Sequence, residues 1–422
     1  MSNSTSTSTP TPEPNQSQPL SYQTTTYQNG LLPHPAPPPP LPFNPLTWET
    51  LAQAHLSPNS YGYVQGSAGT GSTATNNLQA FTKWALVPSR LNRTPTPYAD
   101  LRTRLFGHEY ASPIAIAPVG VQRIFHPAGE KATAAAAGAG APDLQVPYIL
   151  STATATSIED VAAANGAGPR WFQLYWPGNE HDEITLSLLA RAKNAGYSVL
   201  VVTLDTYVLG WRPGDLDHGY NPFLRADDIG VAAGFSDAVF RRRFRERHGV
   251  EVEEDVGRAA AEWAGVIFPG YSHGWEDVGF LRRHWEGPIV LKGIQSVGDA
   301  ERAVEVGVQG VVVSNHGGRQ LDGGVGSLTV LSEIVDAVGD RLEVLFDSGV
   351  RCGADVAKAL ALGAKMVLVG RPYVYGLAVG GEEGVRHVLR CLLGELQLTL
   401  HLAGVQSVRS EHLNRDVLRW VG

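Results

Sequence analysis

From residue 113 onward the sequence alternates between short apolar runs and longer stretches with a helical pattern. The apolar runs are rich in Val, Ile and Leu, which is typical of strands buried on both faces of a parallel sheet. They occupy residues 113–118, 148–151, 170–176, 198–205, 288–293, 310–315, 343–349 and 366–370. Eight strand–helix units in succession predict a closed (β/α)8 barrel, the TIM barrel, rather than an open sheet.

The helical stretches lie between most of these runs, as the crossover connections of a parallel sheet require. They are found at 128–138, 157–164, 183–195, 298–306, 328–338 and 353–362. The chain has 422 residues, 43% of them hydrophobic, and a single barrel domain can reach this length with insertions. We therefore expect one domain at 46–422.

One long connection interrupts the alternation after the fourth strand. About sixty residues separate Arg212 from Trp275, where one helix would be enough. A structureless loop of this length is uncommon in a compact domain, so we expect the insertion, at about 213–274, to contain short helices and to serve a function. We interpret its basic run, Arg241 to Arg247, as a solvated helix face and not as a nucleic-acid site.

The N-terminal residues 1–45 differ in composition from the rest of the chain. They are rich in Ser and Thr and then in Pro, with eight prolines between Pro33 and Pro45. A segment of this kind buries too little apolar surface to offset the entropy of ordering, so we predict a disordered tail.

The charge of the chain and its lack of targeting signals indicate which partners and which cellular location to expect. A net charge of −8 argues against nucleic acid or anionic membrane as partners, and no apolar run approaches the roughly 20 residues of a membrane span. The N-terminus has no secretory pattern, no Lys or Arg precedes Lys83, and the C-terminus is not Ser-Lys-Leu. We therefore expect a cytoplasmic protein. The two cysteines, Cys352 and Cys391, are too few for a zinc cluster, and no metal is expected.

In a TIM barrel the active site lies at the carboxyl ends of the strands. Polar side chains and glycines follow every predicted strand. In chain order they are Pro118, Val119 and Gly120; Ser151; Gln173 and Tyr175; Thr203, Asp205 and Arg212; Lys292; Ser314, His316 and Arg319; Asp347, Ser348, Gly349, Val350 and Arg351; and Gly370 and Arg371.

The last two of these loops are the usual place for a phosphate in such barrels. Gly349 and Gly370 let backbone N–H groups approach an anion, and Arg351 and Arg371 can pair with phosphate oxygens. One loop of this kind could equally be a tight turn, but two adjacent loops with the same chemistry favour a phosphate site.

Lys292 closes an apolar strand, where a lysine is either an ion-pair partner or a cation directed at an electron-rich ligand. Beside a flavin it would stabilise negative charge on the reduced ring. Gln173, Thr203 and Ser151 could hydrogen-bond to the polar edge of the ring, or could simply cap their own loops.

His316 follows a buried strand, and Asp205 stands at the next-but-one strand end. Asp205 could hold the imidazole of His316 and raise its pKa, as a general base requires. The same end of the barrel receives groups that suit a substrate carboxylate, namely Arg212, Arg319, Tyr175 and, from the N-terminal segment, Tyr63. The set predicts a site for a small carboxylic acid with an oxidisable α-position.

The run Ser314-Asn315-His316-Gly317-Gly318-Arg319-Gln320 resembles the signature of the FMN-dependent 2-hydroxy acid oxidase and dehydrogenase family. Residues 172–175, 203–206, 291–293, 347–351 and 370–372 match the family in order, and the resemblance covers roughly Thr47 to Leu402. It implies FMN as cofactor and a small 2-hydroxy acid and O2 as substrates.

The resemblance also implies a role for each site residue. His316 takes the proton with support from Asp205, and Lys292 stabilises the reduced flavin. Tyr175 is placed with the catalytic groups, and the substrate-binding residues are Tyr63, Tyr175, Arg212, His316 and Arg319. Val119 and Gly120 back the flavin, and the remaining strand-end residues hold the cofactor. Whether His316 removes the hydroxyl proton or the α-proton stays open.

Within the family the chain is most similar to the lactate 2-monooxygenase branch, on residues 204–213, 274–277 and 291–295 and on its long insertion. Ala153 stands where plant-type glycolate oxidases carry a tryptophan. This branch converts L-lactate and O2 to acetate, CO2 and water, and the insertion would retain pyruvate in the site. By analogy with the family we expect a homotetramer or a homo-octamer.

Two alternatives accompany this interpretation. The first is an oxidase or dehydrogenase that releases the 2-keto acid, with H2O2 if it is an oxidase. The second is a barrel that binds FMN or a sugar phosphate without this chemistry, against which His316, Asp205, Lys292 and Arg319 all argue. The loop at 69–73 lacks the acidic residues that the family usually has there, which is a departure from the pattern.

Overall fold

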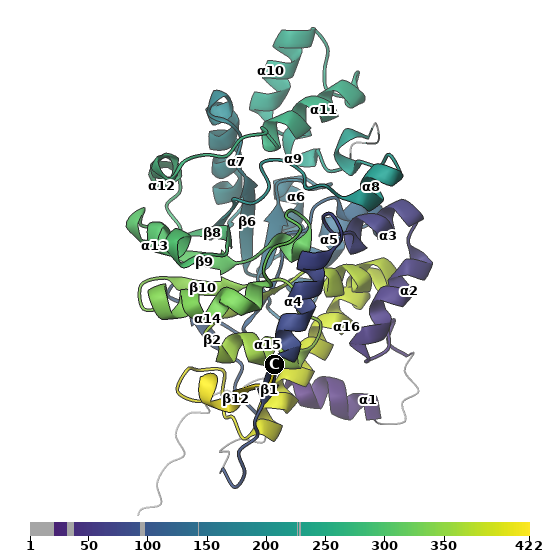
Figure 1. The fold of residues 1–422 in the computed structure, drawn as a ribbon. Helices are drawn as coiled ribbons and strands as arrows, with labels where there is room; N and C mark the ends of the chain where they lie inside the picture. The colour runs from purple at the N-terminus through teal and green to yellow at the C-terminus, as the bar shows by residue number, and fades with distance from the viewer. Residues whose placement is uncertain (1–20, 32–37, 93–97, 142, 226, 228) are drawn as a thin grey trace, which may run out of the picture.

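The computed structural model describes residues 21–31, 38–92, 98–141, 143–225, 227 and 229–422. Eight parallel strands form a closed barrel in the spatial order β10-β11-β4-β5-β6-β7-β8-β9 (Figure 1). They are β4 (Ile114–Ile116), β5 (Tyr148–Ser151), β6 (Arg170–Tyr175), β7 (Leu200–Thr203), β8 (Ile289–Ile294), β9 (Gly310–Val313), β10 (Glu343–Phe346) and β11 (Met366–Val369). The predicted TIM barrel is confirmed, and each strand overlaps one of the apolar runs.

The strands are apolar on both faces because each face packs against a different partner. Val201, Val290 and Val312 belong to the cluster that fills the barrel, while their neighbours Val202 and Leu291 belong to the outer cluster under the helices. A hairpin of β2 (Thr103–Leu105) and β3 (His108–Tyr110) covers the start of β6, where the rings of Phe106 and Tyr110 each lie 6.0 Å from that of Trp171. This hairpin closes the amino end of the barrel and leaves the carboxyl end for a site.

Helices surround the barrel as the alternation predicts (Figure 1). They are α5 (Gly129–Ala137), α6 (Ile158–Asn165), α7 (Asp182–Asn194), α12 (Val278–His284), α13 (Val297–Glu305), α14 (Ser327–Val338), α15 (Gly353–Ala361) and α16 (Arg371–Ala403). Before the barrel come α2 (Trp48–His55), α3 (Pro58–Gln65) and α4 (Ser72–Thr82), and β1 (Trp84–Leu86) pairs with β12 (Leu418–Trp420) near the C-terminus. Within the described residues no helix is both long enough and apolar enough to cross a membrane.

The insertion folds into short helices, as expected. They are α8 (Pro213–Asp217), η5 (Pro222–Leu224), α9 (Ala232–Phe235), α10 (Ala238–His248) and α11 (Val256–Ile267), and α10 and α11 form the upper end of the molecule in Figure 1. Phe240 and Phe244 of α10 are fully buried, with the ring of Phe240 5.2 Å from that of Trp263 in α11. These side chains are continuous with the hydrophobic cluster that surrounds the barrel.

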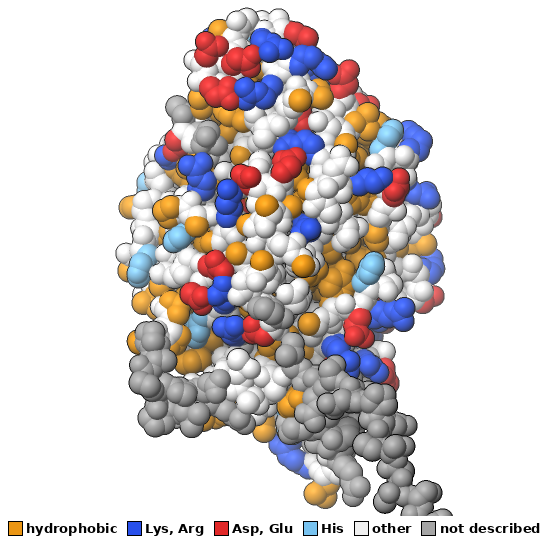
Figure 2. All heavy atoms as spheres, turned by 180° about the vertical axis from the view of Figure 1, so that it is seen from behind, with side chains coloured by type: hydrophobic (Ala, Val, Ile, Leu, Met, Phe, Trp, Pro, Cys, Tyr) orange, Lys and Arg blue, Asp and Glu red, His pale blue; other side chains and the backbone are white. Residues whose placement is uncertain are grey.

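The basic run of α10 is neutralised by acidic neighbours. Arg241 pairs with Glu253, Arg245 with Glu251, and Arg247 with Glu262. Figure 2 shows the same mixture of acidic and basic side chains over this end of the molecule. The arginines thus form an exposed, ion-paired helix surface.

Part of the tail that we expected to be disordered forms structure. A π-helix, η1 (Gln23–Gln28), packs along α16, where the Gln23 amide donates to Gln397 Oε1 at 2.9 Å, and α1 (Asn29–Leu31) follows it. Tyr22 and Leu41 are almost completely buried. The composition of 1–45 hides these two apolar residues, whose burial offsets the entropy of ordering their neighbours. Residues 1–20 and 32–37 lie outside the described residues.

Candidate functional site

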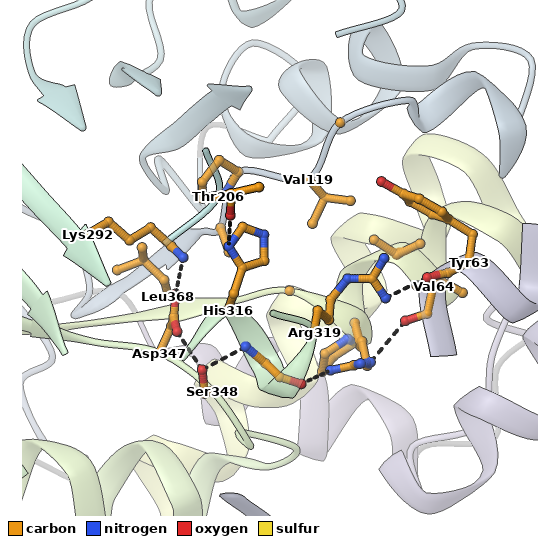
Figure 3. Close-up of a pocket in the computed structure, with 18 of the residues that line it drawn as sticks. Tyr63, Val64, Val119, Thr206, Lys292, His316, Arg319, Asp347, Ser348 and Leu368 are labelled. Atoms are coloured by element: carbon orange, nitrogen blue, oxygen red, sulfur yellow. Dashed lines mark hydrogen bonds and ion pairs between the residues drawn. The ribbon is translucent and has the colours of Figure 1, made fainter. Parts of the chain in front are cut away.

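A cavity opens at the carboxyl ends of the strands, bounded by α3 on one side and by the insertion on another (Figure 3). About 930 Å³ free of protein atoms lies within the cavity and across its open mouth. Its lining includes most of the predicted site residues, namely Tyr63, Pro118, Val119, Gly120, Tyr175, Arg212, Lys292, His316, Arg319, Asp347, Ser348, Gly349, Val350, Arg351, Gly370 and Arg371. The fold thus gathers residues from Tyr63 to Arg371 at one place.

Five predicted residues stand behind this lining. Ser151, Gln173 and Thr203 are buried at the carboxyl ends of β5, β6 and β7. Asp205 and Ser314 contact lining residues directly, Asp205 at His316 and Ser314 at Lys292. These five can act on a ligand only at the floor of the cavity or through a neighbour.

His316 is held by Asp205. Its Nδ1 lies 2.8 Å from Asp205 Oδ1 and 3.1 Å from Thr206 Oγ1, and Thr206 in turn donates to Asp205 at 2.7 Å. Because a carboxylate only accepts hydrogen bonds, Nδ1 carries the proton and Nε2 has the free lone pair. Figure 3 shows Nε2 on the cavity side of the ring. The arrangement can accept a proton from a molecule in the cavity.

The electrostatics of this pair differ from the expectation in one respect. Burial lowers the pKa of His316, and although Asp205 raises it, Lys292 and Arg212 lower it further, so the net pKa lies below the usual histidine value. Asp205 does raise the pKa of His316, as expected, but burial and the nearby cations outweigh its effect. Burial would raise the pKa of Asp205, but His316 and Lys292 hold it well below its ordinary value. A neutral imidazole beside an ionised carboxylate is the state that accepts a proton.

Lys292 combines the two functions that the sequence left open. Its Nζ lies 3.3 Å from Asp347 Oδ2 and 3.0 Å from Ser314 Oγ, so it has an ion-pair partner. Burial lowers the pKa of Lys292, but Asp347 and Asp205 more than offset this and keep it above its usual value. Because Lys292 also lines the cavity, it presents a permanent positive charge there.

Two arginines lie beside the ring of Tyr63. The guanidinium of Arg319 lies 4.8 Å from the ring centre and that of Arg212 lies 5.9 Å from it. Arg319 donates to the carbonyls of Tyr63 and Gly66, and Arg212 to the carbonyl of Arg319. Among the described residues neither arginine forms an ion pair, and burial together with Arg212 lowers the pKa of Arg319 to about 9. The Asp215 carboxylate acts on both guanidinium groups, but from beyond ion-pair distance. Two neighbouring guanidinium groups without a direct ion pair, one buried and one partly buried, favour the binding of an anion.

The predicted phosphate loops are present, but their arginines differ. Arg371 donates to four carbonyls, of Val64, Gln65, Gly66 and Gly317, which ties the end of α3 to the loop after β9. In the part of the chain that the structure describes, the Arg351 side chain donates to the Val350 carbonyl alone. Arg351 therefore has more donors left for an anion than Arg371 has.

The two glycines of these loops contribute in different ways. Gly349 has a φ of +91°, and a Cβ there would lie 2.7 Å from the carbonyl oxygen of Asn77, so only glycine fits. Gly370 has open space where a Cβ would stand, with Ala117 Cβ the only neighbour at 4.0 Å. That space is part of the cavity and leaves the backbone accessible to a ligand.

Unpartnered polar atoms test whether a flavin fits. Gln173 Nε2 and Thr203 Oγ1, at the ends of neighbouring strands, are buried and have no hydrogen-bond partner within the described residues. A buried donor left unpaired costs about 1–3 kcal/mol, so these atoms require a ligand with hydrogen-bonding groups. The carbonyl and N–H edge of a flavin, next to the Lys292 cation, matches them. Ser151 differs, because its Oγ accepts from the Ala153 amide and caps its own loop.

Several lining residues escaped the sequence analysis. Phe223 and Phe268, from the insertion, pack against each other with ring centres 5.2 Å apart. Phe268 also lies 5.1 Å from Tyr175, and Phe223 lies 6.3 Å from Tyr63, so the four rings form one apolar wall. No local pattern in the insertion identifies these two phenylalanines, because only the tertiary fold brings them to the barrel. Thr206, by contrast, lies within a motif that the sequence analysis singled out.

Comparison with known proteins identifies an FMN-dependent family. The sequence model of the FMN-dependent dehydrogenase family matches residues 52–419. An FMN-dependent alpha-hydroxy acid dehydrogenase of Schizosaccharomyces pombe is 59% identical over 401 residues, which cover 95% of this chain and 96% of the relative. A second protein of the same description, from Penicillium citrinum, is 53% identical, with 94% and 95% covered.

More distant similarity extends to oxidases. The L-lactate oxidase of Lysinibacillus sphaericus is 41% identical over 350 residues, which cover 82% of this chain and 86% of the relative. Among solved structures, mandelate oxidase superposes with a TM-score of 0.73 at 36% identity, covering 87% of this chain and 96% of that one.

In the described part of the chain no group of three or more His, Cys, Asp and Glu side chains is arranged to hold a metal ion.

Proposed function

The chain belongs to the FMN-dependent dehydrogenase family, and from that premise we propose that it oxidises an L-2-hydroxy acid to the 2-keto acid. The cofactor is FMN, which when bound supplies the two-electron oxidation of the α-carbon.

The observation that carries the proposal is the pair of arginines, one buried and one partly buried, beside a partly buried histidine–aspartate pair. Arg212 and Arg319 have no ion-pair partner among the described residues, and a substrate carboxylate would supply the missing negative charge. Bound there, the carboxylate would hold the adjacent α-carbon near His316. A 2-hydroxy acid has both features, a carboxylate and an oxidisable α-carbon, in one small molecule.

His316 is the general base in this proposal. Its Nε2 takes the hydroxyl proton if the α-hydrogen leaves as a hydride, or the α-proton if the substrate passes through a carbanion. In both routes Asp205, 2.8 Å from Nδ1, stabilises the imidazolium that forms. The same residues serve both routes.

The cofactor would be held by the floor and the phosphate end of the cavity. Gln173 Nε2 and Thr203 Oγ1 would hydrogen-bond to the polar edge of the ring, and Lys292 would stabilise negative charge on it. The phosphate would lie over Gly349 and Gly370, with Arg351 as its main side-chain partner.

We propose release of the 2-keto acid as the first outcome and lactate 2-monooxygenation as the second. The dehydrogenase and lactate oxidase descriptions of similar proteins favour the first. The wall of Phe223 and Phe268 favours the second, because an insertion that covers the cavity would retain pyruvate for conversion to acetate. We also propose that the substrate is a small 2-hydroxy acid and that O2 is the oxidant.

A product assay distinguishes the two outcomes. Purified holoenzyme is incubated with L-lactate in air, and pyruvate, acetate and H2O2 are quantified together, with the His316→Ala variant as control. Equal amounts of pyruvate and H2O2 would establish an oxidase, and acetate equal to the lactate consumed would establish a monooxygenase. Flavin that stays oxidised with lactate and with longer 2-hydroxy acids would contradict the proposal.

The location and the assembly of the protein stay predictions from the sequence. We propose a cytoplasmic homotetramer or homo-octamer. Sedimentation of the purified holoenzyme tests the assembly, and a monomer would contradict it.

A further inference from the structure

Gln320 lies outside the cavity lining and yet contacts two of the groups assigned to the reaction. Its Oε1 accepts from Arg212 Nη2 at 2.8 Å and from the Gly210 amide at 3.2 Å. Its Nε2 donates to the carbonyls of Asp205 at 2.8 Å and Val208 at 2.9 Å. All four hydrogen-bonding positions of the amide are therefore occupied by one loop, the loop after β7.

These contacts fix the orientation of the amide. The two carbonyls can only accept, and the guanidinium and the backbone N–H can only donate. Turning the Gln320 amide by half a turn would place donor against donor and acceptor against acceptor. The side chain is thus specific for both amide functions, and no other residue type supplies the same pattern at this length.

The loops after β7 and β9 are also in close contact around Gln320. A Cβ at Gly210 would lie 2.5 Å from the Arg319 carbonyl oxygen and 2.6 Å from that of Gln320. Arg212 Nε donates to the Arg319 carbonyl at 3.1 Å. The loop after β7 therefore rests on the loop after β9, and Gln320 binds its beginning at Asp205 and its end at Arg212.

We propose that Gln320 is a positioning residue that sets the distance between the substrate carboxylate and the base. This inference rests on the proposed function, in which Arg212 binds the carboxylate and Asp205 supports His316. Gln320 acts on the reaction through these two residues. Reacting groups tolerate little misplacement, so loosening the loop would weaken carboxylate binding and slow proton transfer together.

The test compares Gln320→Met with Gln295→Met in FMN-loaded protein. Methionine keeps the length of the side chain and removes all four hydrogen bonds, while Gln295 makes one long bond, 3.4 Å to the Val325 carbonyl, and serves as the matched control. The readouts are FMN content, thermal midpoint, the Kd of pyruvate from the change in the flavin spectrum, and the limiting rate of anaerobic flavin reduction.

For Gln320→Met we expect unchanged FMN content, a Kd of pyruvate raised by roughly tenfold or more, and a reduction rate lowered by a similar factor. The acid limb of the pH profile should move to lower pH, because a displaced Asp205 no longer raises the pKa of His316. Gln295→Met should match the wild type in all of these.

A second variant keeps the test decisive if methionine impairs folding. Gln320→Glu retains the two acceptors for Arg212 and Gly210 but cannot donate to Asp205 and Val208, and its charge competes with the substrate carboxylate for Arg212. It too should raise the Kd of pyruvate. A lower thermal midpoint with unchanged Kd, rate and pH profile in either folded variant would overturn the inference. Wild-type enzyme whose flavin no 2-hydroxy acid reduces would overturn the proposed function and the inference with it.

Discussion

At the residue scale the site depends on which charges are paired and which are not. Lys292 is paired with Asp347, and Asp205 with His316. Arg212 and Arg319 form no ion pair among the described residues, although Asp215 acts on both from a longer distance. Burying a cation without a counter-ion destabilises a fold, so such an arrangement persists where a ligand supplies the charge. The difference between paired and unpaired charges determines the expected effect of each single substitution.

Replacement of His316 by alanine should abolish flavin reduction by substrate and leave FMN bound. The imidazole is the base in the proposed reaction, and it makes none of the contacts assigned to the phosphate. Anaerobic mixing of His316→Ala with a substrate of the wild-type enzyme, followed by the flavin absorbance, tests this. Normal bleaching in the variant would remove His316 from the mechanism.

Replacement of Arg319 by methionine should mainly weaken substrate binding. A lost hydrogen bond to a charged group costs about 1.5–3 kcal/mol, which corresponds to a fall in kcat/KM of one to two orders of magnitude. Arg415→Met is the control, because Arg415 pairs with Asp336 on the surface. An unchanged kcat/KM in Arg319→Met would place the carboxylate elsewhere.

The pH dependence follows from the pKa of His316, which lies below its usual value of 6.5. Since only neutral imidazole accepts a proton, kcat/KM should be constant at neutral pH and should fall in acid with a midpoint below 6.5. Asp205→Asn should shift the midpoint further down and lower the rate, because Asp205 raises the pKa of His316. A wild-type midpoint above the usual histidine value would contradict this account.

At the element scale the strands were predictable and much of the N-terminal part was not. Strands buried on both faces are continuous apolar runs, so composition alone located all eight. Helix α3, by contrast, has the sequence Pro-Asn-Ser-Tyr-Gly-Tyr-Val-Gln, which is poor in helix-forming residues, and it is held in place by Arg371 at its end. The hydrogen bond from Arg371 to the Val64 carbonyl joins residues 307 positions apart, so the local sequence of α3 does not indicate it.

The end of β8 shows the same limit at the site itself. The register of β8 against β9 shifts between Lys292 and Ile294, and Gly293 there has a φ of +109°. A Cβ on Gly293 would lie 3.1 Å from Asp205 Cβ and 3.2 Å from Oδ2, the oxygen that has no hydrogen-bond partner. The sequence indicated Lys292 and Asp205 separately but not that a glycine between them leaves room for the carboxylate.

Gly293→Ala should therefore slow flavin reduction by about tenfold or more through displacement of Asp205. Gly249→Ala is the matched control, because Gly249 also has a positive φ, +73°, but faces open space. Both variants should lose a similar amount of stability, about 1–2 kcal/mol, from the unfavourable φ. Equal reduction rates in the two variants would show that Gly293 has no effect on Asp205.

At the scale of the whole molecule, the barrel supplies the groups and the added segments enclose them. The barrel residues of the site were predictable because the carboxyl ends of parallel strands meet at one end of a TIM barrel. Tyr63, which lies outside the barrel, was a candidate from the sequence, but Phe223 and Phe268 were missed, since their contacts with the barrel depend on how the insertion folds over it. We expect α3 and the insertion to determine which substrates fit and whether the product is retained.

The central claim is that this assembly oxidises an L-2-hydroxy acid with FMN. The most direct measurement is anaerobic mixing of the purified holoenzyme with the L and D forms of lactate and of longer 2-hydroxy acids, with the flavin absorbance followed over time. We predict rapid bleaching by the L form of at least one of these acids and much slower bleaching by its D form. Flavin that stays oxidised with all of them, in enzyme that is folded and loaded with FMN, would contradict the claim.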